Sequence, residues 1–198
     1  MNRIALLDLD GTLADYDAAM LRDLNAIRSP LEPEETVPHR SNEPYMKARA
    51  KMVRSQPGWW LNLAPLKKGF DIVELLKKYS FDLHVLTKAP HSVDAAWTEK
   101  VLWCKNHLPN TDITITQEKS LVYGKILVDD WPPYVTEWLK YRPRGLVIMV
   151  EQRWNKDYEH PQVVKYNGAN LDEVEARIKK IVDAEEYAKI ALEYGLPA

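Results

Sequence analysis

The sequence has only one cysteine among its 198 residues, and its apolar stretches are all short. A lone cysteine excludes an internal disulfide framework and is typical of a reducing compartment. A membrane-spanning helix needs about 20 consecutive apolar residues, which the sequence does not supply. The first residues also lack the charged-then-apolar pattern of a signal peptide. We therefore expect a cytoplasmic protein with no membrane partner.

The chain is also low in net charge and in closely spaced cysteine or histidine pairs. Its formal net charge of −2 argues against a general nucleic-acid-binding surface, so we expect no stable nucleic-acid partner. Zinc is not expected, because neither type of pair lies near the acidic motifs described below. One segment is nevertheless basic, which suggests attraction of a small anion, although a solvated helix face is the ordinary explanation. Between residues 37 and 68 the single acid Glu43 is outnumbered by Arg40, Lys47, Arg49, Lys51, Arg54, Lys67 and Lys68.

Short apolar runs alternate with helical patterns along most of the chain. The runs predict strands at 4–7, 83–86, 113–115, 126–128 and 146–150. Helical spacing appears at about 70–79, 93–108 and 135–141, and Cys104 falls on the apolar stripe of the second of these. A long final helix is predicted from Leu171, with Asn170 and Glu173 as its capping pair. This alternation predicts an α/β fold: a three-layer, Rossmann-like parallel sheet with helices on both faces.

One segment interrupts the alternation after the first strand. No strand is predicted from about Met20 to Pro65, and several prolines divide this segment into two helical pieces, one before Ser29 and one at about 44–53. We expect residues 20–65 to form a small helical cap over the sheet edge. Residues 1–19 and 66–198 are then predicted to form the α/β core.

Residues 7–15, Leu-Asp-Leu-Asp-Gly-Thr-Leu-Ala-Asp, place two carboxylates where the first predicted strand ends. Parallel sheets bind ligands beyond the carboxyl ends of their strands. Asp8 and Asp10 point the same way because side chains alternate along a strand, so both could address one ligand or metal. An Asp-Gly pair can also simply make a turn. A calcium loop is excluded, because the further acidic positions of that motif are missing before Gly11.

Three later features follow other predicted strands. Thr87 ends the second, Lys119 follows the third, and Asp129 and Asp130 end the fourth. Taken singly, they could be a helix cap, a solvated lysine and a turn. Together with Asp8 they supply what phosphoryl transfer needs: a nucleophile, a proton shuttle and positive charge for the non-bridging oxygens. Magnesium suits these carboxylates, since it prefers hard oxygen ligands.

In their order along the chain, these motifs resemble the four motifs of the haloacid dehalogenase-like phosphatases. The resemblance implies that Asp8 is the nucleophile and that Asp10 is the general acid and base. It implies that Thr87 and Lys119 hold the phosphoryl oxygens. It also implies a magnesium ion bound by Asp8, the backbone carbonyl of Asp10 and Asp129, with Asp130 in support.

Within that superfamily the chain is similar to the 5′(3′)-deoxyribonucleotidases. The similarity includes residues 13–16, the Trp-Trp-Leu-Asn-Leu-Ala-Pro-Leu string at 59–66, and the segments 99–108 and 117–130. In that branch aromatic residues enclose the base, which predicts substrate contacts from Tyr16, Trp59 and Trp60. The alternative for the two tryptophans is that they wedge the cap onto the core.

Two residues depart from the pattern of that branch. Lys88 follows Thr87 where the branch usually has a small serine, and Gln117 replaces an arginine. Both positions lie near the phosphate in the family, so both residues are predicted to bind substrate. We expect Lys88 to restore the positive charge lost at Gln117.

The sequence therefore predicts a magnesium-dependent nucleotidase acting on a small anionic substrate, a deoxyribonucleoside monophosphate. A homodimer is one assembly that the sequence leaves open. Two alternatives stay open as well. The same chemistry could act on a sugar phosphate or on a polynucleotide 3′-phosphate. A non-catalytic nucleotide-binding protein of the same fold is the other, although such a protein would usually have lost Asp8 or Asp10.

Overall fold

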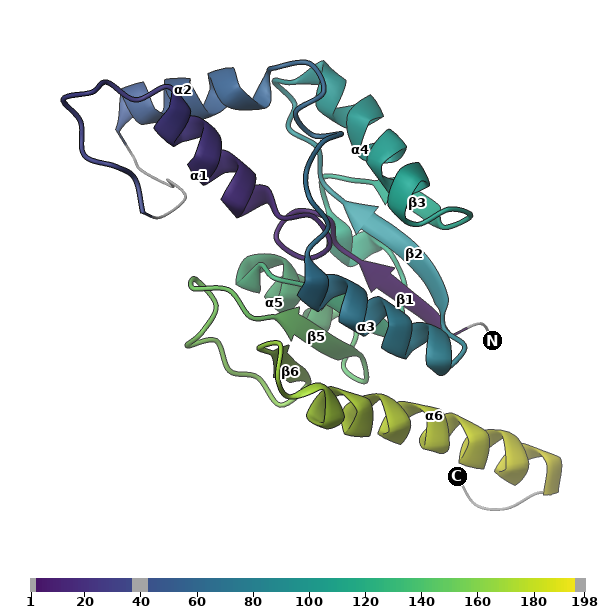
Figure 1. Ribbon diagram of the computed structural model, residues 1–198. Coiled ribbons are helices and arrows are strands. Elements are labelled where there is room, and N and C mark those ends of the chain that lie inside the picture. Colours follow the sequence, from purple (N-terminus) through teal and green to yellow (C-terminus); the bar gives the residue numbers. More distant parts are fainter. Residues whose placement is uncertain (1–2, 37–42, 195–198) are drawn as a thin grey trace.

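A computed structural model describes residues 3–36 and 43–194 as a six-stranded, fully parallel sheet flanked by helices (Figure 1). The strand order is β3-β2-β1-β4-β5-β6, so the first strand lies in the middle of the sheet. This confirms the predicted α/β class. The strands are β1 (Ile4–Leu7), β2 (Asp82–Thr87), β3 (Asp112–Ile115), β4 (Ile126–Asp129), β5 (Leu146–Val150) and β6 (Val163–Tyr166).

Strand β6 is missing from the sequence prediction. It is an edge strand in which only Val164 and Tyr166 are fully buried, whereas all five residues of β5 are buried. The other strands are predicted from continuous apolar runs, which are typical of strands covered on both faces. A four-residue alternating strand gives a much weaker signal.

The central sheet separates two apolar clusters, as the three-layer prediction requires. The larger cluster joins one face of the sheet to α3 (Lys67–Lys78), α4 (Asp94–His107) and α6 (Leu171–Tyr194). The smaller cluster joins the opposite face to α5 (Pro132–Lys140). Neighbouring residues of β1 and β4 enter different clusters, because side chains alternate between the faces of a strand. Leu7 and Val128 belong to the larger cluster, whereas Leu6 and Leu127 belong to the smaller.

Two helices lie between β1 and α3, at the positions predicted for the cap: α1 (Tyr16–Ala26) and α2 (Pro44–Arg54). They contact each other and lie beyond the end of β1 (Figure 1). The side chain of Asp15 accepts the backbone N–H of Ala18 and so caps α1. Helix α1 begins four residues before the predicted cap boundary at residue 20, and the division of the chain into cap and core stays a prediction. Of the basic segment, Arg40 lies outside the described residues.

Two details of the predicted helices differ from the structure. Lys100 and Trp103 lie on the buried face of α4, whereas Trp97 and Val101 of the predicted stripe are only half-buried. Cys104 is buried as expected. Near the start of α6, Asn170 donates to the carboxylate of Glu173 through its side chain, and its side-chain oxygen accepts the backbone N–H of Asn167. The predicted capping pair is therefore a side-chain to side-chain bond. No helix in the described ranges is both long and apolar enough to cross a membrane.

The start of α3 packs directly against the turn that follows β1. At Gly69 a Cβ atom would lie 2.0 Å from the carbonyl oxygen of Thr12 and 3.1 Å from the Cα of Leu13. Both obstacles are backbone atoms, which cannot rotate away as a side chain can. The absence of a side chain at residue 69 therefore fixes how closely α3 approaches the Asp8–Thr12 segment.

We expect Gly69→Ala to lower the free energy of unfolding by about 1–3 kcal/mol, because overpacking forces the backbone apart. Urea denaturation followed by circular dichroism measures this change. Lys77→Ala, on the exposed side of the same helix, is the matched control and should change stability by no more than about 0.5 kcal/mol. A Gly69→Ala variant as stable as the parent would contradict the close approach.

Candidate active site

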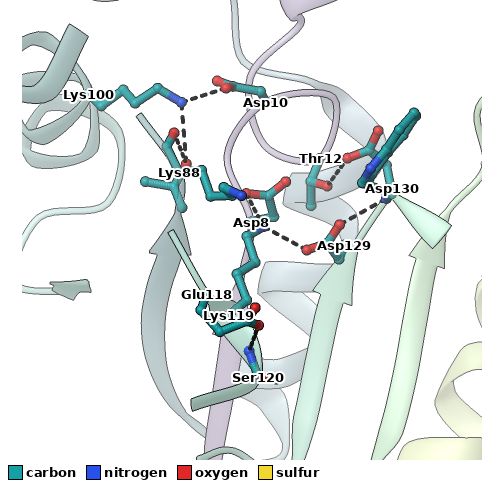
Figure 2. A network of polar contacts seen from close by, with 12 residues as sticks. Asp8, Asp10, Thr12, Lys88, Lys100, Glu118, Lys119, Ser120, Asp129 and Asp130 are labelled. Carbon is teal, nitrogen blue, oxygen red and sulfur yellow. Dashed lines mark hydrogen bonds and ion pairs between the residues drawn. The ribbon is translucent and has the colours of Figure 1, made fainter. Parts of the chain in front are cut away.

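The charged residues of the predicted site meet at the carboxyl edge of the central strands (Figure 2): they are Asp8, Asp10, Lys88, Lys119, Asp129 and Asp130. Leu7 pairs with Val85 of β2 and with Val128 of β4, so this register brings the ends of three strands side by side. Asp8 follows β1, and its backbone N–H donates to the carbonyl of Val128 at 2.8 Å. A pocket of about 620 Å³ opens there, between the sheet edge and helices α1 and α2. Its polar lining includes Asp8, Asp10, Lys119 and Asp130.

Lys119 joins two of the carboxylates. The short helix η1 (Lys119–Leu121) places its ammonium 2.6 Å from Asp8 Oδ1 and 2.7 Å from Asp129 Oδ2. The lysine is 2% exposed and Asp129 is fully buried. Burial alone would lower the pKa of Lys119, but Asp129 and Asp8 together raise it above its usual value. The ammonium is therefore a permanent positive charge at the end of β1.

Asp130 is held from three directions beside this pair. Its Oδ1 accepts the hydroxyl of Thr12 at 3.2 Å, and its backbone carbonyl accepts the side-chain amide of Asn155 at 2.8 Å. Gly11 has a φ of +78°, and a Cβ there would lie 2.7 Å from Asp130 Oδ2, so only glycine permits this approach. Burial, followed by the charges of Asp129 and Asp8, raises the pKa of Asp130 well above its usual value.

Asp8, Asp129 and Asp130 each offer an oxygen atom, and these atoms lie within 4.8 Å of one another. Burial raises the pKa of Asp129 too, although the charge of Lys119 opposes that effect. A second cation would relieve the remaining repulsion between the carboxylates. The donor set consists of oxygen atoms alone, which fits a hard divalent ion such as Mg²⁺ better than zinc. The predicted supporting residue Asp130 thus stands within the side-chain cluster itself.

The carboxylate of Asp10 lies outside that cluster and pairs with a residue absent from the sequence prediction. Its Oδ2 lies 2.5 Å from the ammonium of Lys100, which is 1% exposed and belongs to α4. The same ammonium donates to the hydroxyl of Thr87 at 3.3 Å. Burial raises the pKa of Asp10, the charge of Lys100 lowers it, and the balance lies above the usual value. A lysine on the buried face of a helix is the signal that could have identified Lys100.

Thr87 lies at the end of β2 as predicted but is 1% exposed and lies behind the pocket lining. Its hydroxyl donates to the carbonyl of Lys88 at 3.3 Å. Binding of phosphoryl oxygens by Thr87 therefore stays a prediction.

The predicted aromatic contacts form one cluster beside helix α1. Trp59 lies 5.3 Å from Tyr16 and 4.9 Å from Trp60, both close to perpendicular. Tyr16 and Trp60 line the pocket, whereas Trp59 is outside its lining and donates through Nε1 to Asp23 of α1. Burial raises the pKa of Tyr16 to about 12, so its hydroxyl stays protonated. Trp59 thus joins α1 to the loop that follows α2. Trp60 and Tyr16 face the space where a ligand would lie.

Lys88 and Gln117 both line the pocket, and substrate binding by them stays a prediction. The ammonium groups of Lys88 and Lys119 lie 4.6 Å and 5.1 Å from the centroid of the same ring, that of Tyr134. Lys88 therefore adds a second positive charge near the nucleophile candidate. Gln117 instead uses its side-chain N–H to hold the carbonyl of Ala89 at 2.9 Å.

The basic segment divides into pocket and surface residues. Lys47 and Arg54, seven residues apart on α2, line the pocket. Arg49 instead pairs with Glu32, and Lys67 pairs with Asp71. The positive charge that faces the pocket is therefore smaller than the composition of the segment suggests.

Comparisons with known proteins agree with this geometry. The family described as "5′ nucleotidase, deoxy (Pyrimidine), cytosolic type C protein" matches residues 2–181. A putative 5′(3′)-deoxyribonucleotidase of Bordetella pertussis is 26% identical over 178 residues, which cover 85% of this chain and 94% of that protein. The cytosolic-type 5′(3′)-deoxyribonucleotidase of Homo sapiens is 31% identical over 144 residues, or 63% of this chain and 69% of the human protein. The chain therefore belongs to the cytosolic type C family of 5′ nucleotidases and is a phosphatase, in agreement with the resemblance of its motifs to those of the haloacid dehalogenase-like phosphatases.

Proposed function

We propose that this nucleotidase is a magnesium-dependent enzyme that releases phosphate from deoxyribonucleoside monophosphates through an aspartyl-phosphate on Asp8. The observation that carries the proposal is the different surroundings of two carboxylates in one pocket. Asp8 is held by Lys119 beside Asp129, whereas Asp10 is held separately by Lys100. Such a separation assigns one carboxylate to attack and the other to proton transfer.

In the first step, an oxygen of Asp8 attacks phosphorus, and the bond from phosphorus to the nucleoside oxygen breaks. Asp10, whose pKa lies above its usual value, donates its proton to that oxygen as it leaves. In the second step, Asp10 takes a proton from water, which attacks the phosphorus of the aspartyl-phosphate. Inorganic phosphate departs and both carboxylates return to their starting states, so atoms and protons balance over the cycle.

Positive charge near Asp8 stabilises the equatorial phosphoryl oxygens during both steps. Lys119 lies within ion-pair distance of Asp8, and Lys88 lines the same pocket. Asp8, Asp129 and Asp130 would hold Mg²⁺. When bound, the metal supplies further positive charge to the phosphoryl oxygens.

The leaving group is proposed to be a nucleoside because the pocket combines this polar edge with an aromatic wall. Tyr16 and Trp60 offer ring surface on which a base can stack, and Met20 and Met46 from the cap helices add apolar surface. The relatives named as deoxyribonucleotidases support the same substrate class. The human relative's cytosolic designation supports a cytoplasmic location.

We expect Asp8→Asn to lower the turnover of thymidine 5′-monophosphate by at least about 10³-fold, because loss of a nucleophile removes the covalent route. Release of inorganic phosphate measures this. Asp112→Asn is the matched control. Asp112 is exposed at the amino-terminal end of β3, opposite the carboxyl edge, so this change should leave turnover unchanged. Retained turnover by Asp8→Asn would overturn the aspartyl-phosphate mechanism.

Removal of divalent ions with a chelator should abolish activity, and added Mg²⁺ should restore it. Asp129→Asn should raise the Mg²⁺ concentration that gives half-maximal activity by at least about 10-fold, since even outer-shell partners of a metal contribute that much. Titration of activity with Mg²⁺ tests both statements. Full activity in the presence of the chelator would exclude the proposed magnesium site.

Trp60→Leu should raise the KM for thymidine 5′-monophosphate by about 5- to 100-fold, because stacking on a base contributes about 1–3 kcal/mol. The KM for 2-deoxyribose 5-phosphate, which has no base, should change far less. Steady-state kinetics on both substrates measures the difference. An equal change for the two substrates would mean that Trp60 supports the fold of the pocket and does not contact the base.

A further inference from the structure

Lys100 is a buried charge that the proposed chemistry leaves without a task. It lies on α4 between Ala96 and Cys104, both of them buried in the larger apolar cluster. A buried ammonium is stable only where polar groups compensate for lost hydration. The compensating contacts are the 2.5 Å ion pair with Asp10, the 3.3 Å bond to Thr87, and the ring of Trp60, whose centroid lies 4.7 Å away. Two of these partners, Asp10 and Trp60, line the pocket.

The two oxygens of Asp10 have different surroundings as a result. Oδ2 is held by Lys100, as Figure 2 shows. Oδ1 is buried and has no hydrogen-bond partner within the described part of the chain. Asp10 lines the pocket, so the bond to Lys100 fixes the orientation of a carboxylate that a bound molecule would meet.

The same turn of α4 also holds the loop that carries Trp60. Glu99 accepts the backbone N–H of Gly58 at 2.7 Å and that of Trp60 at 3.1 Å. Trp60 therefore cannot move away from Lys100 without breaking these bonds. Residues 99 and 100 together fix the distance between the aromatic wall and the carboxylate of Asp10.

From this geometry we infer that Lys100 is a positioning residue for proton transfer: by holding Asp10 Oδ2, it fixes the orientation of the Asp10 carboxyl group toward the oxygen of the leaving group. This inference rests on the proposed role of Asp10 as general acid. Its consequence concerns the leaving group. A nucleoside oxygen must be protonated to depart, whereas p-nitrophenolate departs with little help from an acid.

The test compares kcat/KM for thymidine 5′-monophosphate and p-nitrophenyl phosphate in Lys100→Met. For each substrate, kcat/KM reports the steps up to departure of the leaving group, so the later attack of water does not affect it. We expect a loss of about 10²-fold or more for the nucleotide, because a positioned acid contributes about 10²–10⁴-fold, and less than about 10-fold for p-nitrophenyl phosphate. Lys100→Arg should recover part of the loss, because guanidinium can still pair with a carboxylate. Lys105→Met, exposed on the same helix, should change neither ratio.

Equal losses on the two substrates would overturn the inference, since a general disturbance of the pocket has no preference for a leaving group. Asp10→Asn separates this failure from failure of the proposed function. If Asp10→Asn shows the unequal losses and Lys100→Met does not, only the positioning role of Lys100 is wrong. If Asp10→Asn also loses both activities equally, the general-acid role of Asp10 is wrong. Thermal unfolding confirms that each variant is folded. If Lys100→Met does not fold, the same comparison of the two substrates is made with Lys100→Arg.

Discussion

The ion pairs of Lys119 are the interaction on which the carboxyl edge of the sheet depends. Asp8, Asp129 and Asp130 crowd their oxygens within 4.8 Å of one another in a region almost without solvent. Removing one partner from a buried ion pair typically costs about 3–5 kcal/mol, because the other charge stays without compensation. Without the ammonium between Asp8 and Asp129, the ends of β1 and β4 would carry two unpaired negative charges. The lysine therefore holds the edge together before any substrate or metal arrives.

Lys100 repeats this solution one strand away, and the two lysines give neighbouring carboxylates different surroundings. Lys119 comes from a short helix after β3, and Lys100 comes from the helix before it. Asp8 and Asp10 are only two residues apart, so backbone geometry alone could not make them chemically distinct. The difference arises from the elements that pack above them.

Most of this site could be predicted from the sequence because its residues follow apolar runs. Asp8 and Asp130 directly follow buried strands and Asp129 is the last residue of one, and a parallel sheet gathers such positions at one edge. Lys100 could not be found in this way, since it lies in mid-helix and its role depends on how α4 rotates against the sheet. Strand β6 could not be predicted, because its alternation of buried and half-buried residues is only four residues long. The separate positions of Trp59 and Trp60 depend on their packing against α1 and α2, which adjacent positions in sequence do not reveal.

The bond between Thr12 and Asp130 joins residues 118 positions apart, and the pair between Lys100 and Asp10 spans 90 positions. Closing such long loops costs entropy before the contacts form, so chains dominated by distant contacts fold slowly. The edge that carries these contacts is thus complete only when β1, α4 and β4 have all joined, so activity of this nucleotidase would report on the packing of these three elements. A partly folded chain would expose its apolar strands without acquiring a competent phosphatase site.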